Sequence, residues 1–110
     1  MSWLLRDGDV LAAVEDPRRG WPATLHGAVL LSPPAFVHTL RVPVALDLAW
    51  CVPTSLDGDR PGLVVRRIRR VGARRAAAPH LRTGRLVVAT AGSFDRWRLH
   101  VGDLLEVRPT

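Results

Sequence analysis

Turn-forming residues interrupt this chain of 110 residues at short and regular intervals. Glycines, prolines and Asp-Gly pairs separate apolar segments that are only a few residues long. Short apolar segments between turn signals are typical of a β-sandwich or β-barrel, and not of a helical bundle. The segments expected to form strands are Val10–Val14, Gly27–Leu31, Phe36–Leu40, Val44–Cys51, Leu63–Val71, Leu86–Thr90 and Leu104–Val107. The sequence therefore predicts a mainly β fold: one domain over residues 1–110, built as a β-sandwich or a partly open barrel of about seven short strands. The connections expected to be most mobile are Pro53–Pro61 and Ala76–Pro79.

One short helix is expected near residues 93–98. Ser93 follows Gly92 and is a residue type that caps helix N-termini, and Asp95 would lie in the first turn, at the positive end of the helix dipole. Phe94 and Trp97 are three residues apart and would share the inner face of this helix. A glycine before a helix can also hold an anion, but ordinary capping is the simpler interpretation of one short turn.

The positive charge is concentrated in the second half of the chain. The formal net charge is +6, every basic residue is an arginine, and lysine, asparagine, glutamine and tyrosine are absent. This bias is typical of a GC-rich genome, so arginine content alone says little about partners. Its distribution says more, because residues 61–110 hold eleven arginines against three acidic residues, and no acidic residue lies between Arg66 and Arg85. Such a run creates a positive local field.

The arginine run has two interpretations. It could bind a polyanion such as a nucleic acid weakly and without sequence preference, with affinity that falls as salt rises. The run has no aromatic residue for base stacking and matches no helix-turn-helix, KH or RRM signature. The alternative is a solvated hairpin whose arginine stems cover apolar surface. The candidate polyanion-binding residues are Arg66, Arg67, Arg69, Arg70, Arg74 and Arg75.

The segment Val44–Cys51 predicts a central strand. Alternation places Leu46, Leu48 and Trp50 on one face and small residues on the other, so both faces are largely apolar. Asp47 lies in the middle of the small-residue face, where an unpaired carboxylate would be prohibitively costly. We expect Asp47 to accept hydrogen bonds from backbone N–H groups of the preceding turn, or from Thr39 or His38, in a structural role.

Several short motifs resemble the domain-of-unknown-function 192 family of small prokaryotic β-sandwich proteins. They are "RRGW" at residues 18–21, "FVHTLRVPVALDLAW" at residues 36–50 and "AGSFDRWRLHVGD" at residues 91–103. The resemblance covers the chain from about Val10 to Val107. On the family pattern, the matching residues are Thr39, Pro43, Asp47, Ala91-Gly92 and Gly102-Asp103. Together with His38, the residues Thr39, Asp47, Gly92, Gly102 and Asp103 are the candidate structural or pocket residues.

The chain departs from this family at several positions. Val37 and His38 stand where the family has methionine and asparagine, Trp21-Pro22 replaces a Leu-Met pair, and Val88 replaces a glutamate. If the glutamate and the asparagine took part in a shared chemistry, this chain would lack both. The resemblance implies a fold but no established activity.

The sequence shows no pattern of known catalytic or metal chemistry. The four histidines have no metal-ligand spacing, and Cys51, the only cysteine, closes an apolar strand where a thiol is usually inert. No catalytic residue, metal or cofactor is therefore expected. The first choice of function is an accessory or binding module for a protein or small ligand; the alternatives are weak polyanion binding through residues 66–85 and an enzyme with an unrecognised site near His38 and Asp47. No signal peptide or membrane span is recognised, so we expect a cytoplasmic monomer.

Overall fold

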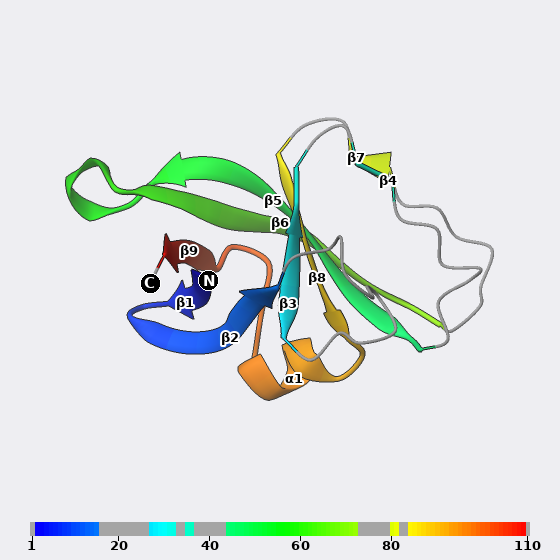
Figure 1. Cartoon of the computed structure of the whole chain (residues 1–110). Helices are drawn as coiled ribbons and strands as arrows, with labels where there is room; N and C mark the ends of the chain where they lie inside the picture. Colours follow the sequence, from blue (N-terminus) through cyan, green and yellow to red (C-terminus); the bar gives the residue numbers. More distant parts are fainter. Residues whose placement is uncertain are drawn as a thin grey trace.

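The computed structural model describes residues 2–15, 27–32, 35–36, 44–72, 80–81 and 84–109. In this part of the chain, seven strands close into a barrel in the order β1-β2-β3-β8-β5-β6-β9, and a two-stranded sheet pairs β4 with β7 (Figure 1). The strands are β1 (Ser2–Arg6), β2 (Asp9–Glu15), β3 (Ala28–Leu31), β4 (Ala35–Phe36), β5 (Leu46–Ser55), β6 (Pro61–Val71), β7 (His80–Leu81), β8 (Arg85–Thr90) and β9 (Leu104–Pro109). A 3-10 turn, η1 (Asp57–Asp59), and a helix, α1 (Ser93–Trp97), complete the described elements. The mainly β prediction with one short helix is confirmed, and the barrel is closed.

The first strand was not among the expected segments. β1 forms a hairpin with β2, and Arg6 pairs with Asp9 across a two-residue turn of Asp7 and Gly8. Both turn residues have positive φ, at 53° and 83°, which is the conformation of a type I′ turn. An Asp-Gly pair between two apolar runs is the standard signal for such a hairpin, and here it marks the start of the barrel.

The strands β5 and β6 are longer than the sequence predicted. β5 continues to Ser55 and β6 begins at Pro61, so the connection expected over Pro53–Pro61 is much shorter, with η1 inside it. The pairing between the two strands shifts register at Trp50 and Cys51, which leaves Arg66 as an extra residue in β6. This bulge changes which β6 side chains face the barrel interior. The expected strand Phe36–Leu40 overlaps β4 only at Phe36; residues 37–40 and Ala76–Pro79 lie outside the described residues.

The central strand β5 is covered on both faces, as expected. It pairs with β6 on one side and with β8 on the other. Its small residues Ala49 and Cys51 face the barrel interior, where they pack with buried side chains from β1, β3, β6, β8 and β9. Leu46 and Leu48 point to the outer face, where they form a second buried cluster with residues of β3, β6 and β8. The small side chains leave room for the interior packing.

The helix α1 closes one end of the barrel (Figure 1). Phe94 is buried in the interior cluster together with Leu99, which follows the helix, and Trp97 packs against that cluster. The rings of Phe94 and Trp97 are in contact, with centroids 5.5 Å apart. These two residues therefore share the inner face of the helix, and α1 acts as a cover over the barrel interior.

Gly84 is expected to be required for the close approach of the chain to β5 at the start of β8. Its φ is +79°, and a Cβ atom there would collide with the carbonyl oxygen of Cys51. We expect Gly84→Ala to lower the free energy of unfolding by about 2–4 kcal/mol, from backbone strain and overpacking together. Gly58→Ala is the matched control, because Gly58 also has positive φ (+69°) but open space around it. It should cost only about 1 kcal/mol. Equal losses in urea denaturation of the two variants would contradict this assignment.

Candidate functional site

The buried carboxylate of Asp47 lies at the N-terminus of α1. Its Oδ2 accepts hydrogen bonds from the backbone N–H groups of Gly92, at 3.0 Å, and Phe94, at 3.1 Å. Its Oδ1 accepts a hydrogen bond from Nε of Arg70, at 2.8 Å. The side chain of Asp47 is only 3% exposed. Asp47 therefore accepts backbone hydrogen bonds at the start of helix α1. The turn at residues 37–43, including Thr39 and His38, which was also expected to supply donors, lies outside the described residues.

This interaction replaces the expected helix cap. Gly92, and not Ser93, occupies the N-cap position, and no side chain adjacent in sequence caps the helix. Gly92 adopts φ 96°, a left-handed conformation that favours glycine. The buried Ser93 side chain instead contacts Thr90 Oγ1, at 3.3 Å, and accepts a hydrogen bond from Arg96. The Asp47 carboxylate, which comes from β5, satisfies the free N–H groups that a local cap would otherwise satisfy.

Arg70 links the buried carboxylate to the surface. Its Nε donates to Asp47, and its Nη2 donates to Asp95 at 2.9 Å. The hydrogen bond to Asp47 is the main cause of a raised Arg70 pKa, and the hydrogen bond to Asp95 adds to it. Asp47 is therefore ion-paired and hydrogen-bonded at both oxygens, and it has no free oxygen directed at a substrate.

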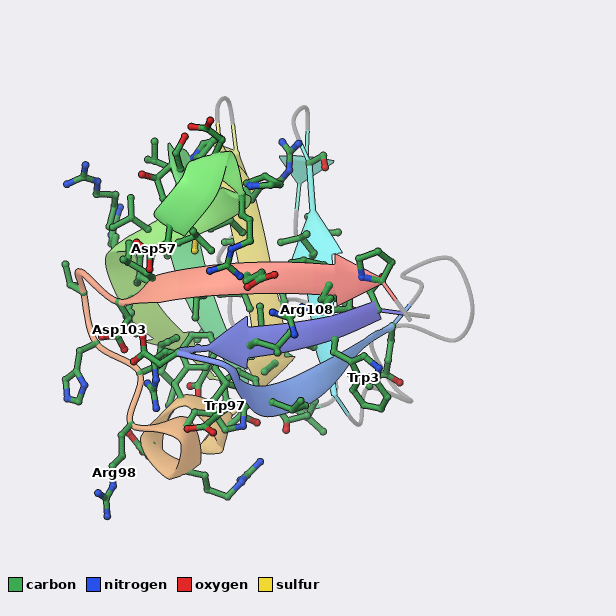
Figure 2. The ribbon with its side chains drawn as sticks, turned by 90° about the vertical axis from the view of Figure 1, so that its left-hand side faces the viewer. Trp3, Asp57, Trp97, Arg98, Asp103 and Arg108 are labelled. Atoms are coloured by element: carbon green, nitrogen blue, oxygen red, sulfur yellow. The ribbon has the colours of Figure 1, made fainter. Side chains whose placement is uncertain are left out.

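The C-terminal end of α1 is held by Arg6, whose positive charge is opposite to that of Asp47 at the N-terminal end. Arg6, at the end of β1, donates hydrogen bonds to the carbonyl oxygens of Trp97 and Arg98 and to Asp103 Oδ2, the last at 3.0 Å. Asp103 also accepts from the backbone N–H of His100, at 2.8 Å. Figure 2 labels Trp97, Arg98 and Asp103 around this end of the helix. Arg6 was not among the expected site residues, because no feature of the neighbouring sequence indicates a partner more than ninety residues away.

The candidate residues Asp47, Gly92, Gly102 and Asp103 thus lie around α1. Gly102 has φ 97°, and its N–H donates to the carbonyl oxygen of Val65, at 2.7 Å, which fixes the turn between α1 and β9 to β6. These four residues position the helix and the turn that follows it. Val88, which the resemblance aligned with a glutamate, is fully buried in the outer apolar cluster.

The cysteine thiol and the metal-ligating residue types of the described part of the chain were the remaining candidates for chemistry. Burial raises the pKa of the Cys51 thiol to about 12, so its nucleophilic thiolate is scarce near neutral pH. No group of three or more His, Cys, Asp or Glu side chains that could hold a metal ion lies in the described part of the chain. His26 and His38 are outside it.

A hollow of about 350 Å³ lies between the tip of the β5–β6 hairpin, the β1–β2 turn and β9. Figure 2 shows this side of the molecule, with Asp57 at the hairpin and Arg108 on β9. Inside the hollow, Glu106 accepts hydrogen bonds from Arg60, at 2.9 Å, and from Arg108. The hydrogen bond from Arg108 is the main reason that the pKa of Glu106 lies below its ordinary value. Glu106 is thus held ionised between two guanidinium groups, which makes it a poor proton acceptor.

Four arginines of the expected polyanion-binding run are on β6: Arg66, Arg67, Arg69 and Arg70, which we call the β6 arginines. All four are exposed. The guanidinium of Arg67 lies over the Trp50 ring, at 4.9 Å from its centroid, and Arg70 is engaged by Asp47 and Asp95. Arg66 and Arg69 have no side-chain partner among the described residues, while Arg74 and Arg75 lie outside them.

Comparisons with known proteins return no match: no family model fits this chain, and no curated protein or solved structure matches it. Within the described residues, no helix has the length and apolar character needed to cross a membrane.

The capping role of Asp47 predicts a large loss of stability when its carboxylate is removed. We expect Asp47→Ala to lower the free energy of unfolding by about 3 kcal/mol, because two buried N–H groups lose their acceptor and Arg70 loses its buried partner. Asp95→Ala is the matched control: Asp95 also binds Arg70, but its side chain is 79% exposed. It should cost less than about 1 kcal/mol. A thermal or urea denaturation series in which the Asp47 and Asp95 variants are equally stable would refute the role.

The buried thiol predicts slow chemical modification. In the folded protein at pH 8, Cys51 should react with Ellman's reagent far more slowly than a free thiol, because burial disfavours the thiolate and blocks access. The same sample in denaturant should react completely within the normal time for an exposed cysteine. Fast reaction of the folded protein would show that Cys51 is accessible and reactive.

Proposed function

We propose that this chain is a non-catalytic binding module that takes up an acidic protein partner through the β6 arginines. The observation that carries the proposal is the contrast between the two sets of charged residues. Asp47, Asp103, Arg6 and Glu106 are already paired, whereas Arg66 and Arg69 are exposed and have no partner among the described residues. Unpaired guanidinium groups on a rigid strand are suited to bind carboxylates bidentately.

A protein partner fits this surface better than a nucleic acid. Binding of single-stranded nucleic acids uses aromatic rings as stacking platforms. Trp50, the aromatic residue that faces Arg67 on the described part of this surface, already has that guanidinium over its ring. Carboxylates need no such platform. Weak polyanion binding by the same arginines is the second proposed function, because their positive field attracts any polyanion.

The family membership and the cellular location belong to the proposal as well. Asp47, Gly92, Gly102 and Asp103, which carry the resemblance to the domain-of-unknown-function 192 family, hold α1 in place in this structure. A shared signature of this kind would preserve the barrel and its cover while the exposed surface changes between proteins. We propose a cytoplasmic, monomeric member of that family whose own binding surface is β6.

The proposal predicts a localised charge effect on binding. A fluorescently labelled polyglutamate peptide should bind the protein at low salt and lose affinity as salt rises. The double variant Arg66→Gln/Arg69→Gln should weaken binding by about fivefold, since exposed charge pairs each contribute up to about 1 kcal/mol. Arg98→Gln/Arg108→Gln removes the same charge from the C-cap of α1 and from β9, and it should have a much smaller effect in fluorescence anisotropy. Equal losses in both double variants would show that only net charge matters.

A further inference from the structure

The strand β6 has an edge that no strand covers in the described part of the chain. Along one edge, β6 pairs with β5 as far as Val71. Along the other edge, it pairs with β9 only at Leu63 and Val64. From Arg66 to Val71, this second edge therefore has no strand partner among the described residues. An edge of this kind presents backbone N–H and C=O groups to any extended chain that approaches it.

The position of α1 explains why this edge is uncovered. The turn before β9 contacts β6 through hydrogen bonds between Gly102 N–H and Val65 O, and between Val65 N–H and Asp103 O. Beyond Val65 the chain belongs to α1, which Asp47 and Arg6 hold at the end of the barrel. The residues before β9 could have paired with β6, but they form α1 and cover the end of the barrel instead. Among the described residues, the helix-capping interactions thus keep this segment away from the edge of β6.

The charges along this edge exclude one occupant and favour another. A second copy of β6 paired antiparallel would place arginines opposite arginines, which is destabilising in a sheet. Carboxylates on an incoming strand would instead face guanidinium groups. Arg67 and Arg69 are two residues apart and share one face, while Ile68, which packs against the barrel interior, points to the other. An incoming strand with acidic residues at every second position and apolar residues between them matches this pattern.

We propose that the edge of β6 from Arg66 to Val71 binds an extended acidic segment of a partner protein as an added β-strand. This inference rests on the proposed function, since it uses the same arginines, and it specifies the mode of binding. Main-chain hydrogen bonds to the edge supply affinity, and the alternating side chains supply specificity. The expected partner segment alternates Glu or Asp with β-branched residues.

The test uses the full chain and a labelled ten-residue peptide of alternating glutamate and valine. Two further peptides carry the same side chains, with backbone N-methyl groups at the odd or at the even positions. Alternate N–H groups of a strand point to opposite sides, so one methylated peptide loses the N–H groups that face β6 and the other keeps them. We expect anisotropy titrations to show at least a tenfold loss for one methylated peptide and little change for the other. The amides between Arg66 and Val71 that face away from β5 should also become protected from hydrogen exchange when the parent peptide binds, whereas those that face β5 are already hydrogen-bonded.

The possible outcomes separate the inference from the proposed function. If both methylated peptides bind like the parent, or lose affinity equally, strand addition is wrong. If the methylated peptides give that result while Arg66→Gln/Arg69→Gln still weakens binding, the β6 arginines bind the acidic peptide, but not by adding a strand to β6. If neither the parent peptide nor polyglutamate binds at low salt, the proposed function fails as well. If duplex DNA at equal charge concentration displaces the bound parent peptide, the natural partner of this surface is a nucleic acid and the acidic-strand inference is wrong.

Discussion

The buried carboxylate of Asp47 determines how this small barrel is closed. A helix of five residues has no stability of its own in water, because the cost of nucleation exceeds what so few hydrogen bonds return. Here the short helix is held at both ends by side chains from strands. Asp47 accepts from N–H groups at its start, and Arg6 donates to carbonyl groups at its end. Both charges have the sign that the helix dipole favours. The cover over the barrel interior, with Phe94 beneath it, depends on these two contacts.

This arrangement separates the charged residues of the protein by role. Some charged residues pair with one another between elements, such as Asp47 on β5 with Arg70 on the neighbouring strand β6, and Arg6 with Asp103. Their hydrogen-bonding groups are occupied by the fold itself. Glu106 is likewise held between Arg60 and Arg108. A residue so engaged can stabilise the structure, but it cannot bind a partner without losing its present contacts. Arg66 and Arg69 on β6 differ from these residues, because they are exposed and have no side-chain partner among the described residues.

The sequence predicted the elements whose signals are local. Alternation placed Asp47 on the small-residue face of a two-sided strand, and Ser93–Trp97 was expected to form the helix; both agree with the structure. The partners of Asp47 could not be predicted, because Gly92 and Phe94 are 45 and 47 residues away and come close only after the barrel closes. The contacts of Arg6 could not be predicted for the same reason. β1 was missed although the Asp7-Gly8 turn signals a hairpin, since its apolar run is short and lies at the start of the chain.

The arginines on β6 protect an exposed strand edge and also select what can bind there. Charged side chains on an edge strand are a common defence against aggregation, because they repel another copy of the same edge. This repulsion acts only against an edge that carries charges of the same sign. Four positive side chains, with Arg67 fixed over Trp50 and Arg70 fixed by two carboxylates, repel a like-charged edge and attract a segment rich in carboxylates. The charges that disfavour pairing with a second copy of this edge are thus the ones that suit it to the acidic strand proposed above. Within the described residues, the segment before β9 forms the helix that Asp47 caps and leaves this edge of β6 without a strand. The buried carboxylate and the exposed arginines are therefore two parts of one arrangement.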